Sequence, residues 1–257
     1  MQIFGLDLWR IILIVVLIFL VAKRANLVAL LAKKQYFSRE FEKALKTFRV
    51  ADKIGNLSPN NKMNYGYICL RLGHLSEARK HLTLCLGLIP KEKQADRNRV
   101  RNLLALVLWK EGHLDEAIEM LEEVMASGFR STSVYQNLGI LYNLTGDAQK
   151  ALAFNQEAYE YNADDAIICD NLADAYAIAE DYEQSAKQYE ALLKKDPPPH
   201  FPEAYYGYGK TLLKLGRKEE GLEKIRESLD KSFSYLSICS KEEIEDLYRQ
   251  NGGVLEE

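Results

Sequence analysis

The sequence predicts an all-α fold in which antiparallel pairs of helices stack into a solenoid, preceded by one N-terminal apolar helix. Three observations support this prediction. A pattern of small and large apolar residues recurs at a nearly fixed spacing along most of the 257 residues. Only 6 prolines and 15 glycines interrupt the chain, which leaves room for long helices. Twelve consecutive apolar side chains, from Ile11 to Ala22, lie close to the N-terminus.

The composition sets wide limits on the class of protein. With 47% apolar and 28% charged residues, the chain is not disordered as a whole and is long enough to bury a core. The net charge of −3 gives no global reason to expect nucleic-acid binding, because no strongly basic domain emerges. We therefore predict no nucleic-acid partner.

The N-terminal segment is predicted to span a membrane over residues 3–22. The twelve apolar residues cover only about 18 Å as a helix, whereas a hydrocarbon core is about 30 Å thick. Twenty residues from Ile3 cover the full thickness, with Asp7 and Arg10 spaced to pair at the outer end. Trp9 suits the membrane interface. The apolar run contributes about −3 to −7 kcal/mol to insertion, which outweighs a charge near the interface.

The charges after the apolar run predict the orientation of this span. Lys23 and Arg24 follow it directly, and the positive-inside rule therefore places the rest of the chain in the cytoplasm. Two alternatives stay open, namely a cleaved signal peptide and the first helix of a soluble core. Cleavage is disfavoured because the best site, after Ala22, has Leu20 where a small residue is wanted.

Four internal segments carry the repeated pattern. They begin at Gly66, Ala105, Gly139 and Ala173. In each, a large apolar residue follows three positions after the small one, and a second small residue follows after twelve. The second small residues are Ala78, Ala117, Ala151 and Ser185.

This phase resembles the tetratricopeptide repeat, a 34-residue helix–turn–helix unit in which these small residues occupy positions 8 and 20. The repeats then start near residues 25, 59, 98, 132, 166 and 202. The first and last copies match less well. The resemblance implies a right-handed superhelix of about six units with a concave groove, because one hairpin cannot bury its own apolar face. The predicted domains are an anchor at 1–24, a solenoid at 25–235, and a capping helix with its tail at 236–257.

Neither catalysis nor a bound metal or cofactor is predicted. The four cysteines form no CxxC pair, and three of them fall at core-facing repeat positions. Unpaired thiols of this kind favour a reducing compartment. His74 and His113 share repeat position 16, so repetition accounts for them. The chain has no phosphate-binding glycine loop, GxSxG or HExxH sequence.

The resemblance also implies which side chains line the groove. In this family, helix-A positions 2, 5, 6, 9, 12 and 13 face the concave side. The predicted peptide-binding residues are Asn64, Tyr67, Arg71, Arg99, Asn102, Trp109, Asn137, Asn171 and Asp174. Three of these asparagines share position 6, where an amide suits a peptide backbone because it both donates and accepts. The alternative is that asparagine is an ordinary helix-surface residue there.

The charges along the predicted groove suggest a partner of mixed charge. Arg71 and Arg99 make the early part basic, and Asp174 lies in a later, acidic part. The predicted function is a membrane-anchored protein–protein interaction scaffold that captures peptide or protein partners in the concave groove. The alternative function is an extracytoplasmic assembly or secretion factor of the same repeats, delivered by a signal sequence.

Overall fold

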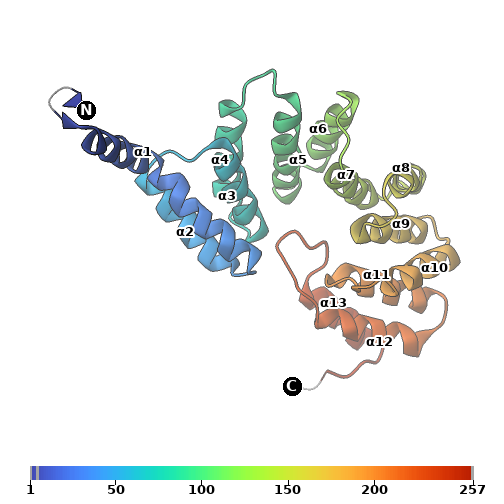
Figure 1. Cartoon of the computed structure of the whole chain (residues 1–257). Helices are drawn as coiled ribbons and strands as arrows, with labels where there is room; N and C mark the ends of the chain where they lie inside the picture. The colour runs from blue at the N-terminus through green and yellow to red at the C-terminus, as the bar shows by residue number, and fades with distance from the viewer. Residues whose placement is uncertain (1, 4–5, 256–257) are drawn as a thin grey trace. The chain divides into compact units, whose positions relative to one another are not determined.

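The computed structural model describes residues 2–3 and 6–255 of the chain, and within them it has thirteen α-helices and one two-residue β-hairpin (Figure 1). The strands are β1 (Gln2–Ile3) and β2 (Leu6–Asp7). The helices are α1 (Leu8–Phe37), α2 (Phe41–Ile54), α3 (Pro59–Arg71), α4 (Leu75–Leu88), α5 (Gln94–Lys110), α6 (Leu114–Ala126), α7 (Thr132–Thr145), α8 (Ala148–Tyr161), α9 (Ala166–Ile178), α10 (Tyr182–Leu193), α11 (Pro202–Lys214), α12 (Lys218–Leu229) and α13 (Lys241–Gln250). The predicted all-α fold of stacked helix pairs is confirmed. The chain divides into two compact units, Met1–Val107 and Leu108–Glu257.

The first helix of the N-terminal unit combines an exposed apolar half with a packed half. From Ile12 to Val21 every residue is between 43 and 63% exposed. Beyond Arg24, Ala25, Ala29 and Ala32 are buried. Their spacing of three to four residues puts these small side chains on one face of α1, against which α2 packs. The apolar segment and the first helix of the first repeat are therefore parts of one continuous helix.

The start of this helix differs from the sequence prediction. We expected the helical span to begin at Ile3, but β1 and β2 pair antiparallel and α1 begins at Leu8. The helical part of the apolar segment is therefore shorter than expected. The predicted pairing of Asp7 with Arg10 is confirmed, with 3.8 Å between Oδ2 and Nε. The proposed boundary between anchor and repeats lies inside α1, and the predicted domains stay a prediction.

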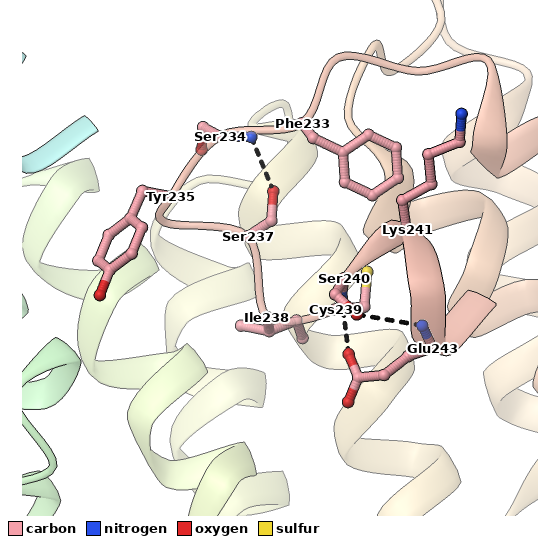
Figure 2. A pocket seen from close by; sticks show the side chains of 9 residues that line it. All are labelled: Phe233, Ser234, Tyr235, Ser237, Ile238, Cys239, Ser240, Lys241 and Glu243. Carbon is pink, nitrogen blue, oxygen red and sulfur yellow. Dashed lines mark hydrogen bonds between the residues drawn. The ribbon is translucent and has the colours of Figure 1, made fainter. Parts of the chain in front are cut away.

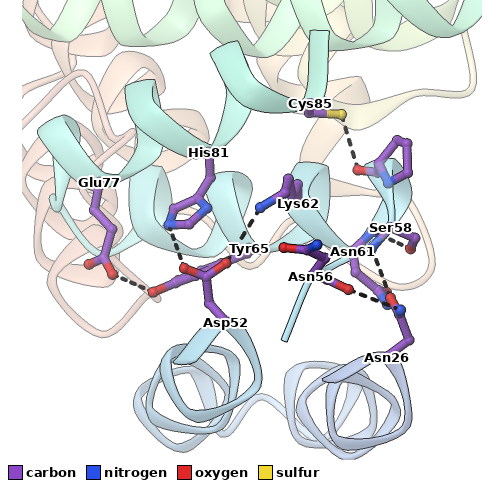
Figure 3. Close-up of polar contacts among 11 residues, drawn as sticks. Asn26, Asp52, Asn56, Ser58, Asn61, Lys62, Tyr65, Glu77, His81 and Cys85 are labelled. Carbon is purple, nitrogen blue, oxygen red and sulfur yellow. Dashed lines mark hydrogen bonds and ion pairs between the residues drawn. The ribbon is translucent and has the colours of Figure 1, made fainter. Parts of the chain in front are cut away.

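A polar network ties α1 to the repeat that follows it (Figure 3). The Asn26 side-chain oxygen accepts hydrogen bonds from the Ser58 N–H and from the Asn61 amide, both at 2.8 Å. The Asn26 amide donates to the Asn56 carbonyl at 3.3 Å. Ser58 also caps α3 by accepting from the Asn61 N–H. The packed half of α1 is therefore held in place by the start of the next helix pair.

A second polar group in this unit centres on Glu77. Its carboxylate accepts from the Arg49 guanidinium, with 2.8 Å between Nη2 and Oε2, and from the Tyr65 hydroxyl. Hydrogen bonding by Arg49 lowers the pKa of Glu77 to about 2, against the opposing effect of burial. Tyr65 is buried and stacks between Phe48 and His81. Glu77 therefore stays ionised and holds α2, α3 and α4 together.

Substituting Glu77→Gln should destabilise the N-terminal unit at pH 7 by about 1 to 3 kcal/mol, because two partners lose a charged acceptor. A carboxyl whose pKa is lowered by folding stabilises the folded state fully when the pH is above its pKa in the unfolded chain. That contribution disappears as the pH falls through its pKa in the folded chain. The difference between the two chains should therefore shrink between pH 4.5 and about 2. Urea unfolding followed by circular dichroism measures it. Glu92→Gln, in an exposed loop, is the matched control, and a difference that persists at pH 2 would contradict the assignment.

Helix starts in the C-terminal unit follow local sequence signals. α7, α9 and α11 begin at Thr132, Ala166 and Pro202, the residues near which repeats were expected to start. The side chains of Ser131 and Asp165 cap α7 and α9 by accepting main-chain hydrogen bonds, and proline opens α11. In the N-terminal unit, α5 begins at Gln94, four residues before its expected start, in the longest interval between repeats.

The C-terminal end of this unit is closed by α13. The helix starts with a capping box between Ser240 and Glu243 and has one buried apolar residue, Ile244, which packs with Ile225 and Cys239. The three cysteines that were predicted to face the core are buried, Cys239 is buried as well, and all four are free. Burial raises the pKa of Cys85 to about 11 and of Cys239 to about 12, which favours the protonated thiol over the nucleophilic thiolate.

Candidate functional site

Three of the predicted binding residues of the N-terminal unit contact other side chains of the chain. Tyr67 is half-buried and meets the Tyr36 ring edge-on at 6.1 Å. The Arg71 guanidinium lies 4.5 Å from the centroid of the Phe41 ring. Arg99 is exposed but pairs with Asp96 at 2.7 Å, which offsets its charge. Asn64 is half-buried on α3 and Asn102 is buried on α5.

Two of the predicted residues in the C-terminal unit serve helix packing. Asn171 is buried, and its amide donates to the Gln136 carbonyl at 2.9 Å, while its own carbonyl accepts from the Asn143 amide at 2.8 Å. Asn171 thereby joins α9 to α7. Asp174 accepts from the Tyr189 hydroxyl at 2.6 Å. Asn137 is half-buried on α7. A direct role of these residues in binding a partner stays a prediction.

Trp109 lies beside a segment that the sequence did not mark as functional. We call residues 230–240, between α12 and α13, the C-terminal loop. The Lys110 ammonium donates to the Ser237 carbonyl at 3.0 Å, and it lies 3.9 Å from the Trp109 ring centroid and 5.5 Å from that of Tyr235. The end of α5 therefore holds the loop through a cation that lies near two aromatic rings.

A carboxylate from another helix binds the same part of the loop. Glu203, in the first turn of α11, accepts from the Ile238 N–H at 3.1 Å. Burial raises the pKa of Glu203, and hydrogen bonds from the Ile238 main chain and the Ser237 side chain oppose that rise. Burial lowers the pKa of Lys110, and the charge of Glu203 opposes that fall. Both groups are partly removed from water, which strengthens their hydrogen bonds to the loop.

Glu203 belongs to a group of acids on α9 and α11. Asp170 is buried, and its Oδ1 atom makes no hydrogen bond within the described structure. Burial raises the pKa of Asp170 well above its ordinary value, and the charges of Asp174 and Glu203 raise it further, while Lys210 opposes them. Within residues 2–3 and 6–255, no group of three or more His, Cys, Asp or Glu side chains is arranged to hold a metal ion.

A pocket of about 520 Å³ lies against the C-terminal loop, and nine residues between Phe233 and Glu243 line it (Figure 2). In Figure 2, Tyr235 points away from the side of the loop on which Phe233 and Cys239 lie. The pocket is thus formed by the loop and the start of α13. The predicted binding residues take no part in lining it.

Sequence reasoning missed Glu203 and the C-terminal loop as parts of one site. Lys110 and Ser237 are 127 positions apart, and the loop shows no repeat pattern that relates it to α5. The one available signal was that Lys110 directly follows Trp109, a predicted binding residue.

Comparisons with known proteins agree with the arrangement of helix pairs. Models of the tetratricopeptide repeat match residues 60–92, 102–166 and 171–233, which together form more than half of the chain. No curated protein matches it significantly.

Several solved structures share the fold at low sequence identity. A tetratricopeptide repeat protein from Parabacteroides merdae ATCC 43184 superposes with a TM-score of 0.70 at 15% identity, covering 89% of this chain and 84% of that one. TTC0263, a thermophilic protein of the same repeats in Thermus thermophilus, gives 0.60 at 17% identity, covering 76% and 98%. A chain of the APC/C hetero-tetramer Cut9–Hcn1 gives 0.69 at 14% identity, covering 89% and 42%.

Proteins of these repeats generally mediate protein–protein interactions, and the fold is typical of non-enzymatic scaffolds. The chain has small residues at the repeat positions, stacked helix pairs, and matches to the repeat models along three stretches. It therefore belongs to the tetratricopeptide repeat family.

Proposed function

We propose that this chain is a membrane-anchored scaffold that captures a protein or peptide partner on the concave side of its repeats. The observation that carries the proposal is the exposed apolar half of α1. Its side chains from Ile12 to Val21 are exposed all round the helix, so no single face is reserved for packing against protein. An apolar surface of this extent favours lipid as its surroundings.

The length of the segment supports a short span with charged ends. The helix from Leu8 to Ala22 is about 22 Å long, less than the roughly 30 Å of a hydrocarbon core. Lys23 and Arg24 are exposed directly after the apolar segment, where long basic side chains suit the lipid headgroups, and Trp9 supplies an interfacial ring at the other end. Local thinning of the bilayer accommodates the remaining mismatch at modest cost. Among the described helices, α1 is the one whose length and composition suit a membrane span.

The continuity of α1 supports a particular role for this anchor. The same helix that carries the apolar segment continues, without a linker, into the face that buries Ala25, Ala29 and Ala32. The first repeat is therefore held at the membrane surface by a rigid helix. Anchoring raises the local concentration of the scaffold around membrane partners, so even weak contacts become effective.

The cytoplasmic orientation of the repeats rests on charge and on thiols. Lys23 and Arg24 directly follow the apolar segment, which matches the positive-inside rule. Four buried cysteines without a disulfide suit a reducing compartment. In an exported protein of the same repeats, the four cysteines would lie in an oxidising compartment.

Labelling with a membrane-impermeant maleimide tests the anchor and its orientation. The native cysteines are buried, so the native chain is the unlabelled control. Ser76→Cys adds one exposed thiol on α4. We expect the variant to sediment with membranes and to be labelled after permeabilisation of the cells. Labelling in intact cells would overturn the orientation, and a soluble, shortened chain would indicate a cleaved signal sequence instead.

A further inference from the structure

We infer that Lys110 and Glu203 form a binding site for one peptide unit of a protein segment, and that the C-terminal loop is its resident occupant. The incoming ligand is a segment of a partner protein with an aromatic side chain two residues before the bound peptide unit. The inference rests on the proposed capture of protein segments. The inference names the residues that hold the partner's segment and the chemistry of that segment. It also states that the segment competes with the chain's own loop.

The geometry of the two hydrogen bonds is the first step. The Ser237 carbonyl, which accepts from Lys110, and the Ile238 N–H, which donates to Glu203, belong to the same peptide group. A cation and a carboxylate from two different helices therefore satisfy both polar atoms of one peptide unit. Main-chain atoms are common to all protein segments, so this pair is able to bind a segment other than the loop.

The aromatic contacts supply selectivity. The Lys110 ammonium lies near the rings of Trp109 and Tyr235, and a cation over an aromatic face is attracted to it electrostatically. Tyr235 is two residues before Ser237. A segment that presents an aromatic ring at the corresponding position would make the same contact, whereas an aliphatic one would not.

We call residues 234–238 of the C-terminal loop its tip, and the way in which the loop is fastened indicates that this tip is replaceable. Phe233 and Cys239 pack with Ile225 and Ile244, so both ends of the tip are fixed in the apolar cluster under α13. Between them, the Ser237 N–H closes a turn on the Ser234 carbonyl at 3.0 Å. Tyr235 and Ile238 remain 44% and 36% exposed. The tip is therefore able to leave its site without exposing the cluster that holds its ends.

A binding assay on the full chain in detergent tests the inference. The loop tip is replaced by Tyr235→Gly, Leu236→Ser, Ser237→Gly and Ile238→Ser, which keeps Phe233 and Cys239. The probe is a fluorescein-labelled peptide of residues 231–241 with Cys239→Ser. Fluorescence anisotropy should show about tenfold tighter binding to the tip-replaced chain than to the native chain, because a tethered loop competes at a millimolar effective concentration.

Substitutions at the two charged residues test the site itself. In the tip-replaced chain, Lys110→Met and Glu203→Met should each weaken probe binding about tenfold or more, because each removes a charge-assisted hydrogen bond. Lys187→Met and Glu183→Met, both exposed on α10, are the matched controls and should leave binding unchanged. A probe with Tyr235→Ala should also bind more weakly.

Hydrogen exchange gives a second measurement that needs no change in the loop. Residues 234–240 should exchange faster in Glu203→Met than in the native chain or in Glu183→Met. Equal probe affinity for the native and tip-replaced chains, or no binding to a tip-replaced chain with intact helical signal, would overturn the inference. Unchanged exchange in Glu203→Met would overturn it as well. None of these results depends on membrane orientation. A failure of the maleimide experiment can therefore be told apart from a failure of this inference.

Discussion

Replacing Val15 and Val16 with arginine should release the chain from membranes. Both valines lie near the middle of the exposed apolar half of α1. An arginine at the centre of a spanning helix costs about 2.5 to 3.5 kcal/mol of insertion free energy, so two of them cancel most or all of what the apolar residues contribute. Snorkelling gives little relief at the centre, because both interfaces are equally far.

Carbonate extraction followed by immunoblotting measures the release. The native chain should stay in the membrane pellet, and the Val15→Arg/Val16→Arg chain should move to the supernatant. Val50→Arg makes the same substitution at an exposed valine of α2 and should leave the chain in the pellet. If the double variant also resists extraction, the apolar segment is not what holds the chain at the membrane.

Substituting Gly209→Ala should destabilise the C-terminal unit, whereas Gly87→Ala should stabilise the N-terminal one. A Cβ atom at Gly209 would lie 2.5 Å from Ile225 Cγ1 and 2.8 Å from the Gly221 carbonyl oxygen. Backbone cannot move aside cheaply there, because α11 and α12 meet at this glycine pair. Overpacking of this kind costs about 1 to 3 kcal/mol, which exceeds the gain in helix propensity.

Gly87 is the matched control, because the same methyl group would meet no atom within 4 Å. It is exposed in the last turn of α4, so alanine should stabilise by about 0.5 to 1 kcal/mol through a less flexible unfolded state. Thermal unfolding followed by circular dichroism should therefore show midpoints that move in opposite directions. Midpoints that both rise would mean that α11 and α12 have room between them.

The repeat phase was predictable because it is a local property of the sequence. Small residues twelve positions apart allow two helices of one hairpin to approach, and α7, α9 and α11 begin where that phase expects them. The early start of α5 was less predictable. The interval between the repeat starts near residues 59 and 98 is longer than the others, and a loop rather than helix packing sets where α5 begins.

The extent of the first helix shows where hydropathy alone is insufficient. Hydropathy counts apolar side chains, and it does not detect that pairing between β1 and β2 delays the helix until Leu8. It also treats Lys23 and Arg24 as a boundary, although both are good helix formers and α1 continues through them to Phe37.

By itself, the sequence determined the helix pairs, the family and the apolar segment, because each depends on residues a few positions apart. Only the tertiary structure decided what the polar residues do. Asn171 is buried and joins α9 to α7, because its amide donates to the Gln136 carbonyl, and its role in holding a peptide stays a prediction. Lys110 and Glu203 meet one peptide unit of a loop that lies far from both in sequence. Such a site depends on how successive helices place distant residues, and no local periodicity records it.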